Sequence, residues 1–207
     1  MTDRAKLSLP VSLRPQSGAI ATSKVAIAAA LICGGTVGCN SSNAADKKIE
    51  AQYDDKSGRL SRLDYDANGN GKPDTWGFMD GMQIIKLEAD ENEDGKVDRW
   101  EYYGVSVQGS GGKPAPERID RATRLDGRVS RREFFEQGRL ARIEEDTDGD
   151  GSTDKWSTYA GGTLATLSMD TQRRGKPDRR LIYRPDGTLD RIETDSAGTG
   201  NFQPVKQ

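Results

Sequence analysis

An acidic, glycine-containing loop recurs six times in this chain at nearly constant spacing, and this repeat restricts the fold more than any other feature. Successive loops begin 24, 32, 24, 24 and 25 residues apart, and the one long interval contains the glycine-rich stretch 109–114. A fixed period of this length is typical of repeat architectures, in which each unit packs only on its neighbours. We therefore expect an array of about six units of roughly 24 residues. The loops begin at Asp66, Asp90, Ala122, Asp146, Asp170 and Asp195.

The segments between the loops favour strands over helices. Most have six to eight residues, are bounded by Gly, Asp and Asn, and carry aromatic residues after the loop. The spacing of three between Leu140 and Ile143, and between Leu164 and Leu167, departs from alternation. A β-bulge, a two-sided sheet or a helical turn would each produce that spacing. We predict a mainly β fold, a repeat array of short β-hairpins in a meander; the alternative is short helices flanking EF-hand-like loops.

Composition favours a thin core. Only 33% of the residues are hydrophobic and 31% are charged, as suits an array better than a globule. Residues 1–38 hold four basic side chains and one acidic one, so the rest of the chain has 27 basic and 32 acidic residues and a net charge of −5. Binding to nucleic acid requires a basic surface, so we expect no nucleic-acid partner.

The N-terminal segment has the features of an export signal. Residues 1–24 are basic and polar, and a short apolar run, Val25–Ile32, follows. The sequence Thr36-Val37-Gly38-Cys39 resembles the processing box of bacterial lipoproteins. The resemblance implies a signal peptide at 1–38 and a lipidated Cys39 with a polar tether at 39–48. The repeat domain that the loop spacing predicts then covers 49–207. The resemblance also implies an exported protein, anchored by lipid in the bacterial cell envelope, at the outer membrane or cell surface. An ordinary secretory signal is the alternative.

The loop at 90–101 contains the ligand types that calcium requires. Calcium takes six to eight oxygen ligands from carboxylates, amide carbonyls and water. Gly95 stands at the sixth position, where a sharp turn is needed, and all twelve positions fit the EF-hand loop pattern. We therefore predict a complete calcium site here. The candidate ligands are Asp90, Asn92, Asp94, the backbone carbonyl of Lys96, Asp98 and Glu101.

Two further loops keep most of this pattern but lack the glutamate at the twelfth position. Ser157 and Gly77 stand there instead, so fewer protein oxygens are available. We expect weaker calcium binding, in the roughly 10⁻⁴–10⁻³ M range of extracellular modules. In both loops the seventh residue, Ser152 or Lys72, would supply a backbone carbonyl. The candidate ligands are Asp146, Asp148, Asp150, Ser152 and Asp154 in one loop, and Asp66, Asn68, Asn70, Lys72 and Asp74 in the other.

The remaining three loops have lost ligands, and we expect them to be turns without metal. Arg173 and Arg174 bring positive charge into the loop at 170, and Ala122 and Arg124 replace the first ligands of the loop at 122. In the last loop only Asp195 is anionic. Asn-Gly and Asp-Gly turns form without any metal, which is the alternative for every loop. The loops at 66, 90 and 146 carry extra ligands that a turn does not need and whose charges repel.

The runs DTDGDGSTDKW at 146–156 and DANGNGKPDTW at 66–76 resemble the thrombospondin type-3-like calcium repeats of bacterial surface proteins. This resemblance covers about 11 residues of each unit and implies calcium at these loops and at the matching residues of loop 90. The connecting segments are similar to the tyrosine–aspartate repeats of bacterial wall proteins, which form β-hairpin sheets.

We predict an exported, membrane-tethered calcium-binding repeat protein with a structural or binding role. The alternative is a metal-free β-repeat module that binds a cell-wall polymer or a protein partner through Trp76, Trp100 and Trp156, although one aromatic per unit also suits a core. The chain has no histidine and no serine-centred nucleophile motif, so we expect no enzymatic activity.

Overall fold

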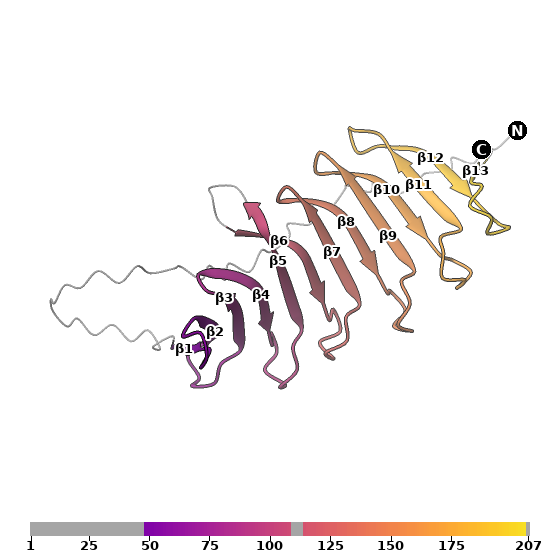
Figure 1. Cartoon of the computed structure of the whole chain (residues 1–207). Helices are drawn as coiled ribbons and strands as arrows, with labels where there is room; N and C mark the ends of the chain where they lie inside the picture. The colour runs from indigo at the N-terminus through magenta and orange to yellow at the C-terminus, as the bar shows by residue number, and fades with distance from the viewer. Residues whose placement is uncertain (1–47, 109–113, 206–207) are drawn as a thin grey trace, which may run out of the picture. The chain divides into compact units, whose positions relative to one another are not determined.

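The computed structural model describes residues 48–108 and 114–205, which form one antiparallel sheet of thirteen strands and no helix. The prediction of a mainly β meander is confirmed, because strand order across the sheet equals strand order in the chain (Figure 1). The strands are β1 (Ile49–Tyr53), β2 (Leu60–Tyr65), β3 (Thr75–Asp80), β4 (Gln83–Ala89), β5 (Arg99–Gln108), β6 (Pro114–Arg121), β7 (Arg131–Glu136), β8 (Arg139–Glu145), β9 (Lys155–Ala160), β10 (Thr163–Met169), β11 (Arg179–Tyr183), β12 (Leu189–Thr194) and β13 (Gln203–Pro204).

The described residues all belong to one compact unit. The predicted signal peptide at 1–38 lies outside the described residues, as does the tether up to residue 47 with Cys39. None of the described residues forms a helix that is long and apolar enough to cross a membrane.

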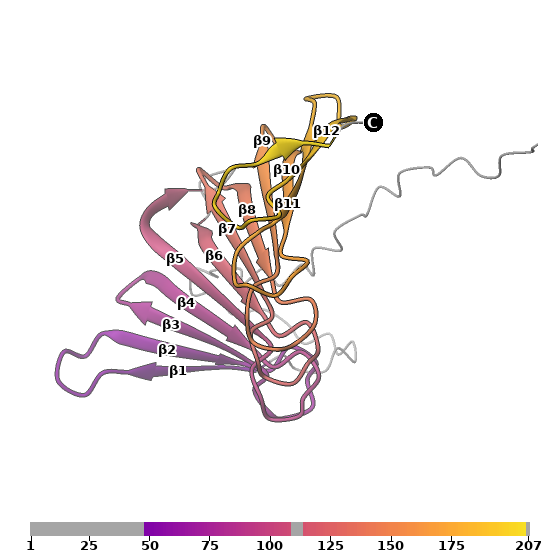
Figure 2. The same cartoon turned by 90° about the vertical axis from the view of Figure 1, so that its right-hand side faces the viewer.

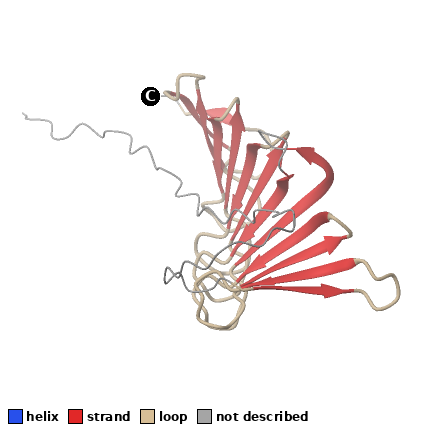
Figure 3. Cartoon of the chain, turned by 90° about the vertical axis from the view of Figure 1, so that its left-hand side faces the viewer, coloured by secondary structure: helices blue, strands red, loops and turns tan. Residues whose placement is uncertain are grey.

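The meander places the two kinds of connection at opposite ends of the strands, so that each kind lines one side of the sheet. All six acidic loops lie along one edge, at 66–74, 90–98, 122–130, 146–154, 170–178 and 195–202. The described connections on the other edge are short turns such as Gln137-Gly138 and Gly161-Gly162. In Figure 1 the loops follow the lower edge, and in Figures 2 and 3 the strands fan out from the edge where the loops gather. We call this the loop edge.

A β-bulge recurs at the same place in six hairpins and explains the leucine spacing. The extra residue in strand β8 is Ala141, because Phe134 pairs with Arg142 while Phe135 pairs with Leu140. In a regular strand, residues three apart point to opposite faces, whereas the inserted residue brings Leu140 and Ile143 to the same face. Of the explanations open at the sequence level, the bulge is therefore the one found. The six inserted residues are Ser61, Ile85, Glu117, Ala141, Ala165 and Asp190.

The core is a single row of aliphatic side chains on one face, which we call the leucine face. Directly opposed residues share a face, and the row includes Leu87, Ile119 and Ile143, which are only 4%, 9% and 3% exposed. Small or acidic residues alternate with them, such as Gly77 beside Leu87 and Ser157 beside Ile143. The adjacent row toward the loop edge adds further buried residues to this face, among them Thr75, Ala89 and Arg99. No second layer covers the face among the described residues. The row consists of Leu63, Leu87, Ile119, Ile143, Leu167, Leu181 and Ile192.

The opposite face, the tryptophan face, carries aromatic and charged residues in two rows. Trp76, Trp100 and Trp156 lie in the row nearer the loop edge and are half-buried. In the next row cations stack on aromatic rings, with Arg118 lying 4.1 Å from the centre of the Tyr102 ring and Arg142 lying 3.9 Å from that of Phe134. These contacts cover the rings without a second layer.

Candidate metal centre

Five of the six acidic loops are folded around the carboxylate at their first position, and loop 122–130 has Ala122 there. In loop 90–98, the backbone N–H of Gly95 donates to Asp90 Oδ2 at 2.8 Å, and Gly71 and Gly151 donate in the same way in their loops. The sixth position has φ between +75° and +91° in all six loops, a region that glycine adopts without strain. The glycine and the first carboxylate therefore fix the turn together in these five loops, and Gly127 keeps the same backbone in loop 122–130.

The side chain at the ninth position closes each of the first five loops. In loop 90–98 the N–H of Glu91 donates to Asp98 Oδ2 at 3.2 Å. In loop 122–130, where Ser130 replaces the aspartate, the N–H of Thr123 donates to the serine hydroxyl at 3.0 Å. A neutral hydroxyl therefore closes the loop as well as a carboxylate does. The closing hydrogen bond alone does not require the negative charge.

The loops are stacked by backbone hydrogen bonds along the loop edge. From the second loop onward, the N–H at the first position donates to the carbonyl at the ninth position of the loop before it, as from Asp90 to Asp74 at 2.9 Å and from Asp170 to Asp154 at 2.8 Å. The candidate ligands of different units therefore form one column, which is interrupted where Ala122 and Ser130 stand.

Loop 90–98 has two buried carboxylate oxygens without partners. Asp98 is 2% exposed and Asp90 is 8% exposed. Their Oδ2 atoms accept backbone N–H groups, but among the described residues the Oδ1 atoms have no hydrogen-bond partner. Burial, together with the negative charges of Asp94 and Asp90, raises the pKa of the Asp98 carboxyl. An anionic group that is buried without a partner is costly unless a cation joins it.

Of the remaining predicted ligands of loop 90, three lie in the loop itself and one, Glu101, does not. Asn92 and Asp94 lie in the loop, where their Oδ1 atoms accept the N–H groups of Asp94 and Lys96 at 3.1 and 2.9 Å. The N–H of Lys96 lowers the pKa of Asp94. The backbone carbonyl of Lys96 belongs to the same loop.

Glu101 is the predicted ligand that the structure does not bring to this loop. It lies on β5, where its carboxylate accepts hydrogen bonds from Arg99 and Tyr103. A helix would bring positions 9 and 12 to one side, whereas in a strand residues three apart lie on opposite faces. Glu101 therefore belongs to the leucine face, and Asp98 lies on the other side of the sheet.

Loop 146–154 brings three carboxylates together. One oxygen each of Asp146, Asp148 and Asp154 lies within 4.8 Å of the others, and Asp148 is exposed. Burial raises the pKa of Asp146, but the N–H groups of Gly149 and Gly151 outweigh it and hold the pKa below its ordinary value. Asp150 and Ser152 lie in the exposed part of the loop, where Asp150 Oδ1 accepts the N–H of Ser152 at 2.7 Å. This loop offers the densest set of carboxylates.

Loop 66–74 is better satisfied by its own groups. Asp66 and Asp74 are buried, and both Asp74 oxygens accept hydrogen bonds, from Ala67 N–H at 3.0 Å and from the Thr75 hydroxyl at 2.8 Å. Asn68 Oδ1 and Asn70 Oδ1 accept the N–H groups of Asn70 and Lys72 at 2.9 and 2.8 Å. All the predicted positions lie in one loop. Unlike Asp98 in loop 90, Asp74 has a hydrogen-bond partner for each carboxylate oxygen, so it needs a cation less.

The three loops that we predicted to lack metal differ from one another. In loop 170–178 the carboxylates of Asp170 and Asp178 accept backbone N–H groups, just as in the predicted sites. In loop 195–202 only Asp195 remains, with Gly200 donating to it at 2.6 Å. Loop 122–130 has neither carboxylate at these positions.

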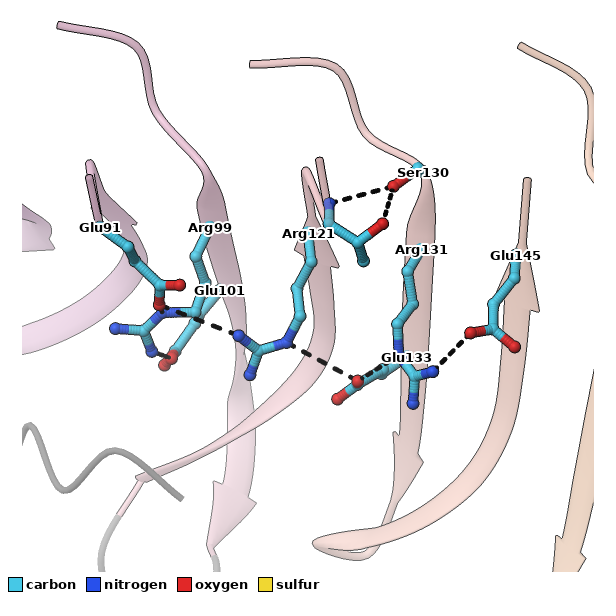
Figure 4. A network of polar contacts seen from close by, with 9 residues as sticks. Glu91, Arg99, Glu101, Arg121, Ser130, Arg131, Glu133 and Glu145 are labelled. Atoms are coloured by element: carbon cyan, nitrogen blue, oxygen red, sulfur yellow. Dashed lines mark hydrogen bonds and ion pairs between the residues drawn. The ribbon is translucent and has the colours of Figure 1, made fainter. Parts of the chain in front are cut away.

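A ladder of ion pairs flanks loop 122–130 on the leucine face (Figure 4). Arg121 and Arg131 stand on either side of the loop and share Glu133, at 3.7 and 2.7 Å. The ladder continues to Glu91 of loop 90 in one direction, through Arg121 at 3.9 Å. In the other direction Arg131 reaches Glu145 at 2.6 Å, which pairs with Lys155 beside loop 146 at 2.8 Å. Fixed cations therefore surround the loop whose carboxylates are missing.

Sequence reasoning missed two residues that contact predicted ligands from a neighbouring loop, Glu93 and Arg173. Glu93 accepts hydrogen bonds from the side chains of Asn68 and Asn70, and Arg173 pairs with Asp148 at 2.9 Å. The sequence does mark both residues, because they stand at the fourth position of their loops, where loops 66, 146 and 195 have glycine. Comparison with known proteins adds no assignment, because no family model and no curated protein matches the chain.

Proposed function

We propose that this chain is a calcium-binding repeat protein, exported and tethered to the cell envelope by a lipid on Cys39, with a structural or binding role. The observation that carries calcium binding is the pair of unpartnered oxygens in loop 90–98, Asp90 Oδ1 and Asp98 Oδ1. A bound cation would give both oxygens the partner that the described protein groups do not.

Loop 122–130 supports this proposal by contrast. Its first and ninth positions are Ala122 and Ser130, yet it keeps the same closing hydrogen bond and the same stacking on loop 90. The carboxylates of Asp90 and Asp98 therefore exceed what the fold needs at these positions. Excess buried negative charge is expected where a cation supplies the compensation.

The ligand types favour calcium over other metals. The side chains at the ligand positions of loops 66, 90 and 146 offer carboxylate and amide oxygens, which are the ligands of hard cations. Zinc prefers cysteine and histidine, and the chain has no histidine. Magnesium demands near-ideal octahedral geometry and retains its waters, whereas calcium accepts the irregular oxygen sets that such loops offer.

Thermal unfolding of the full chain with calcium and with a chelator tests the proposal. We expect calcium to raise the melting temperature, since a ligand that binds only the folded state stabilises it by about 2.7 kcal/mol per site at 100 times its dissociation constant. Calorimetry should count three sites, and magnesium at the same concentration should have a smaller effect. An unchanged melting temperature on chelation would refute calcium binding.

The lipid anchor requires a separate test. Mass spectrometry of the mature protein should find an acylated N-terminal Cys39, and Cys39→Ala should move the protein from the membrane fraction to the soluble fraction. A mature chain that begins elsewhere and carries no lipid would overturn this part of the proposal and leave calcium binding untouched.

A second candidate is a metal-free module that binds a cell-envelope polymer or a protein. The observation that favours it is that Trp76, Trp100 and Trp156 share one half-buried face of a sheet that has no second layer within the described ranges. Binding that persists in chelator and is lost on replacing these residues would support this candidate.

A further inference from the structure

The fourth position of every loop has a left-handed backbone, but three loops place a side chain there. The φ angles are +61° at Glu93, +54° at Leu125 and +55° at Arg173, whereas the other three loops have glycine. A non-glycine residue in this region costs free energy, so its retention calls for a compensating interaction. Two of the three side chains, Glu93 and Arg173, reach the preceding loop.

Glu93 extends from loop 90 to loop 66. Its Oε2 accepts the side-chain N–H of Asn70 at 2.6 Å, and its other oxygen accepts that of Asn68. With their amide N–H groups held by Glu93, both asparagines direct their oxygens into their own loop, where each accepts a backbone N–H. The glutamate thus orients two predicted calcium ligands and brings negative charge to a loop that has neutral residues at positions 3 and 5.

Arg173 makes the corresponding contact with the opposite charge. It extends from loop 170 to loop 146, where its guanidinium pairs with Asp148 Oδ2 at 2.9 Å. Asp148 is one of the three clustered carboxylates, and Arg173 lines the same groove of about 240 Å³ as Asp148 and Asp154. Arg124 also lies against this loop, but it donates to the backbone carbonyl of Asp146 and not to a ligand carboxylate.

The charge of each fourth-position side chain offsets the number of carboxylates in the preceding loop. Counted over positions 1, 3, 5 and 9, loop 66 has two carboxylates, loop 90 has three and loop 146 has four. Glu93 adds one negative charge to the first, the neutral Leu125 follows the second, and Arg173 offsets one charge of the third. The charge of these four positions together with the fourth-position side chain of the following loop is −3 in each case.

We propose that Glu93 and Arg173 set the calcium affinities of the loops that precede them, with Glu93 strengthening loop 66–74 and Arg173 weakening loop 146–154. This inference rests on the calcium function proposed above. Replacing a group that orients metal ligands without binding the metal costs about 10- to 100-fold in affinity. A cation paired with a ligand carboxylate has the opposite effect, since it competes with the metal for that carboxylate. Neither residue is a calcium ligand; both act through the ligands of the neighbouring unit.

The tryptophans allow each loop to be followed separately. Trp76, Trp100 and Trp156 stand two residues after the ninth position of loops 66, 90 and 146. Calcium titration of the full chain, followed by the three indole N–H signals in nuclear magnetic resonance, gives one affinity per loop. We expect Glu93→Gly to weaken binding at the Trp76 loop about tenfold, and Arg173→Gly to strengthen binding at the Trp156 loop about tenfold.

Two control variants test whether an affinity change comes only from removing a strained left-handed backbone or only from changing the net charge of the protein. Gln137→Gly relieves the same left-handed strain, φ +50°, in a short turn at the other edge of the sheet. Arg184→Gln removes one positive charge from an exposed turn at that same edge. Both controls should leave all three affinities within about twofold of the original protein, while Arg173→Gly changes the affinity of one loop only.

The outcomes distinguish this inference from the proposed function. If the original protein binds calcium and neither variant shifts its expected signal, the role of Glu93 and Arg173 is overturned and calcium binding stands. Equal shifts in all three loops would point to net charge and also overturn it. If calcium moves no signal even at 10 mM, roughly ten times the weakest dissociation constants of such modules, the proposed function and this inference fail together.

Discussion

Replacing Asp98 with asparagine changes one charge at a buried position and preserves the shape of the side chain. The asparagine oxygen can still accept the N–H of Glu91, as Asp98 Oδ2 does at 3.2 Å. The neutral amide then stands where Asp98 Oδ1 has no partner, and it removes a charge that the carboxylates of Asp94 and Asp90 repel. The substitution therefore has opposite effects without calcium and with it.

The magnitudes follow from the burial of Asp98. Without calcium, removing an unsatisfied buried group stabilises the fold by about 1 kcal/mol, the low end of its usual cost. A domain of this size shifts its melting temperature by about 2–4 °C per kcal/mol, so the variant should melt about 2–4 °C higher in chelator. With calcium, a tenfold loss of affinity removes about 1.4 kcal/mol of the stabilisation, which exceeds the gain of about 1 kcal/mol. In calcium the variant should therefore melt about 1–2 °C lower than the original protein.

Thermal unfolding followed by circular dichroism measures both effects on the same pair of proteins. Asp126→Asn is the matched control, since Asp126 is exposed in loop 122–130, which has no carboxylate at its first or ninth position. We expect the control to behave like the original protein in both conditions. If Asp98→Asn lowers the melting temperature equally with calcium and with chelator, Asp98 is a structural carboxylate and the reasoning is refuted.

Three further predictions address the core, the repeat and the tryptophan face. Ile143→Ala should cost about 2–5 kcal/mol in urea unfolding, because Ile143 is 3% exposed in a core only one row wide; a cost below 1 kcal/mol would contradict that assignment. The triple change Ala122→Asp, Arg124→Asp and Ser130→Asp restores ligands to a loop that keeps its turn, so calorimetry should count one more calcium per chain, and an unchanged count would argue against a loop-based site. Trp156→Ala should cost about 2 kcal/mol of unfolding free energy, since the side chain is half-buried, whereas a residue that only contacts a partner would leave unfolding unchanged and weaken binding.

The architecture could be predicted from the sequence because each unit repeats the same local signals. The turn glycines, the short segments and the constant period already imply hairpins in a meander, and nearest-neighbour pairing then fixes the strand order. The bulge could only be suspected from the spacing of Leu140 and Ile143, because a helical turn gives the same spacing. Pairing across β7 and β8 distinguishes the two, since Ala141 has no partner in the register.

The candidate site was predicted residue by residue within the loop and less well beyond it. A ligand pattern written for a helix places Glu101 beside Asp98, but alternation in strand β5 turns Glu101 to the other face. The contacts of Glu93 and Arg173 depend on which loops are neighbours at the loop edge, 23 to 25 residues apart in sequence. The sequence pattern describes one loop, whereas these contacts arise from the stacking of loops.

The ion-pair ladder and the metal-type loops are two solutions to one electrostatic problem. Backbone hydrogen bonds hold neighbouring loops close together along the loop edge. Most of these loops carry a carboxylate at both the first and the ninth position. Where Ala122 and Ser130 remove those charges, Arg121 and Arg131 instead organise the adjacent glutamates on the leucine face (Figure 4). Networked pairs of this kind stabilise more than isolated surface pairs. The middle of the array is therefore held by cations of the chain itself, whereas under the calcium function that we propose, loops 90–98 and 146–154 on either side take their cations from solution.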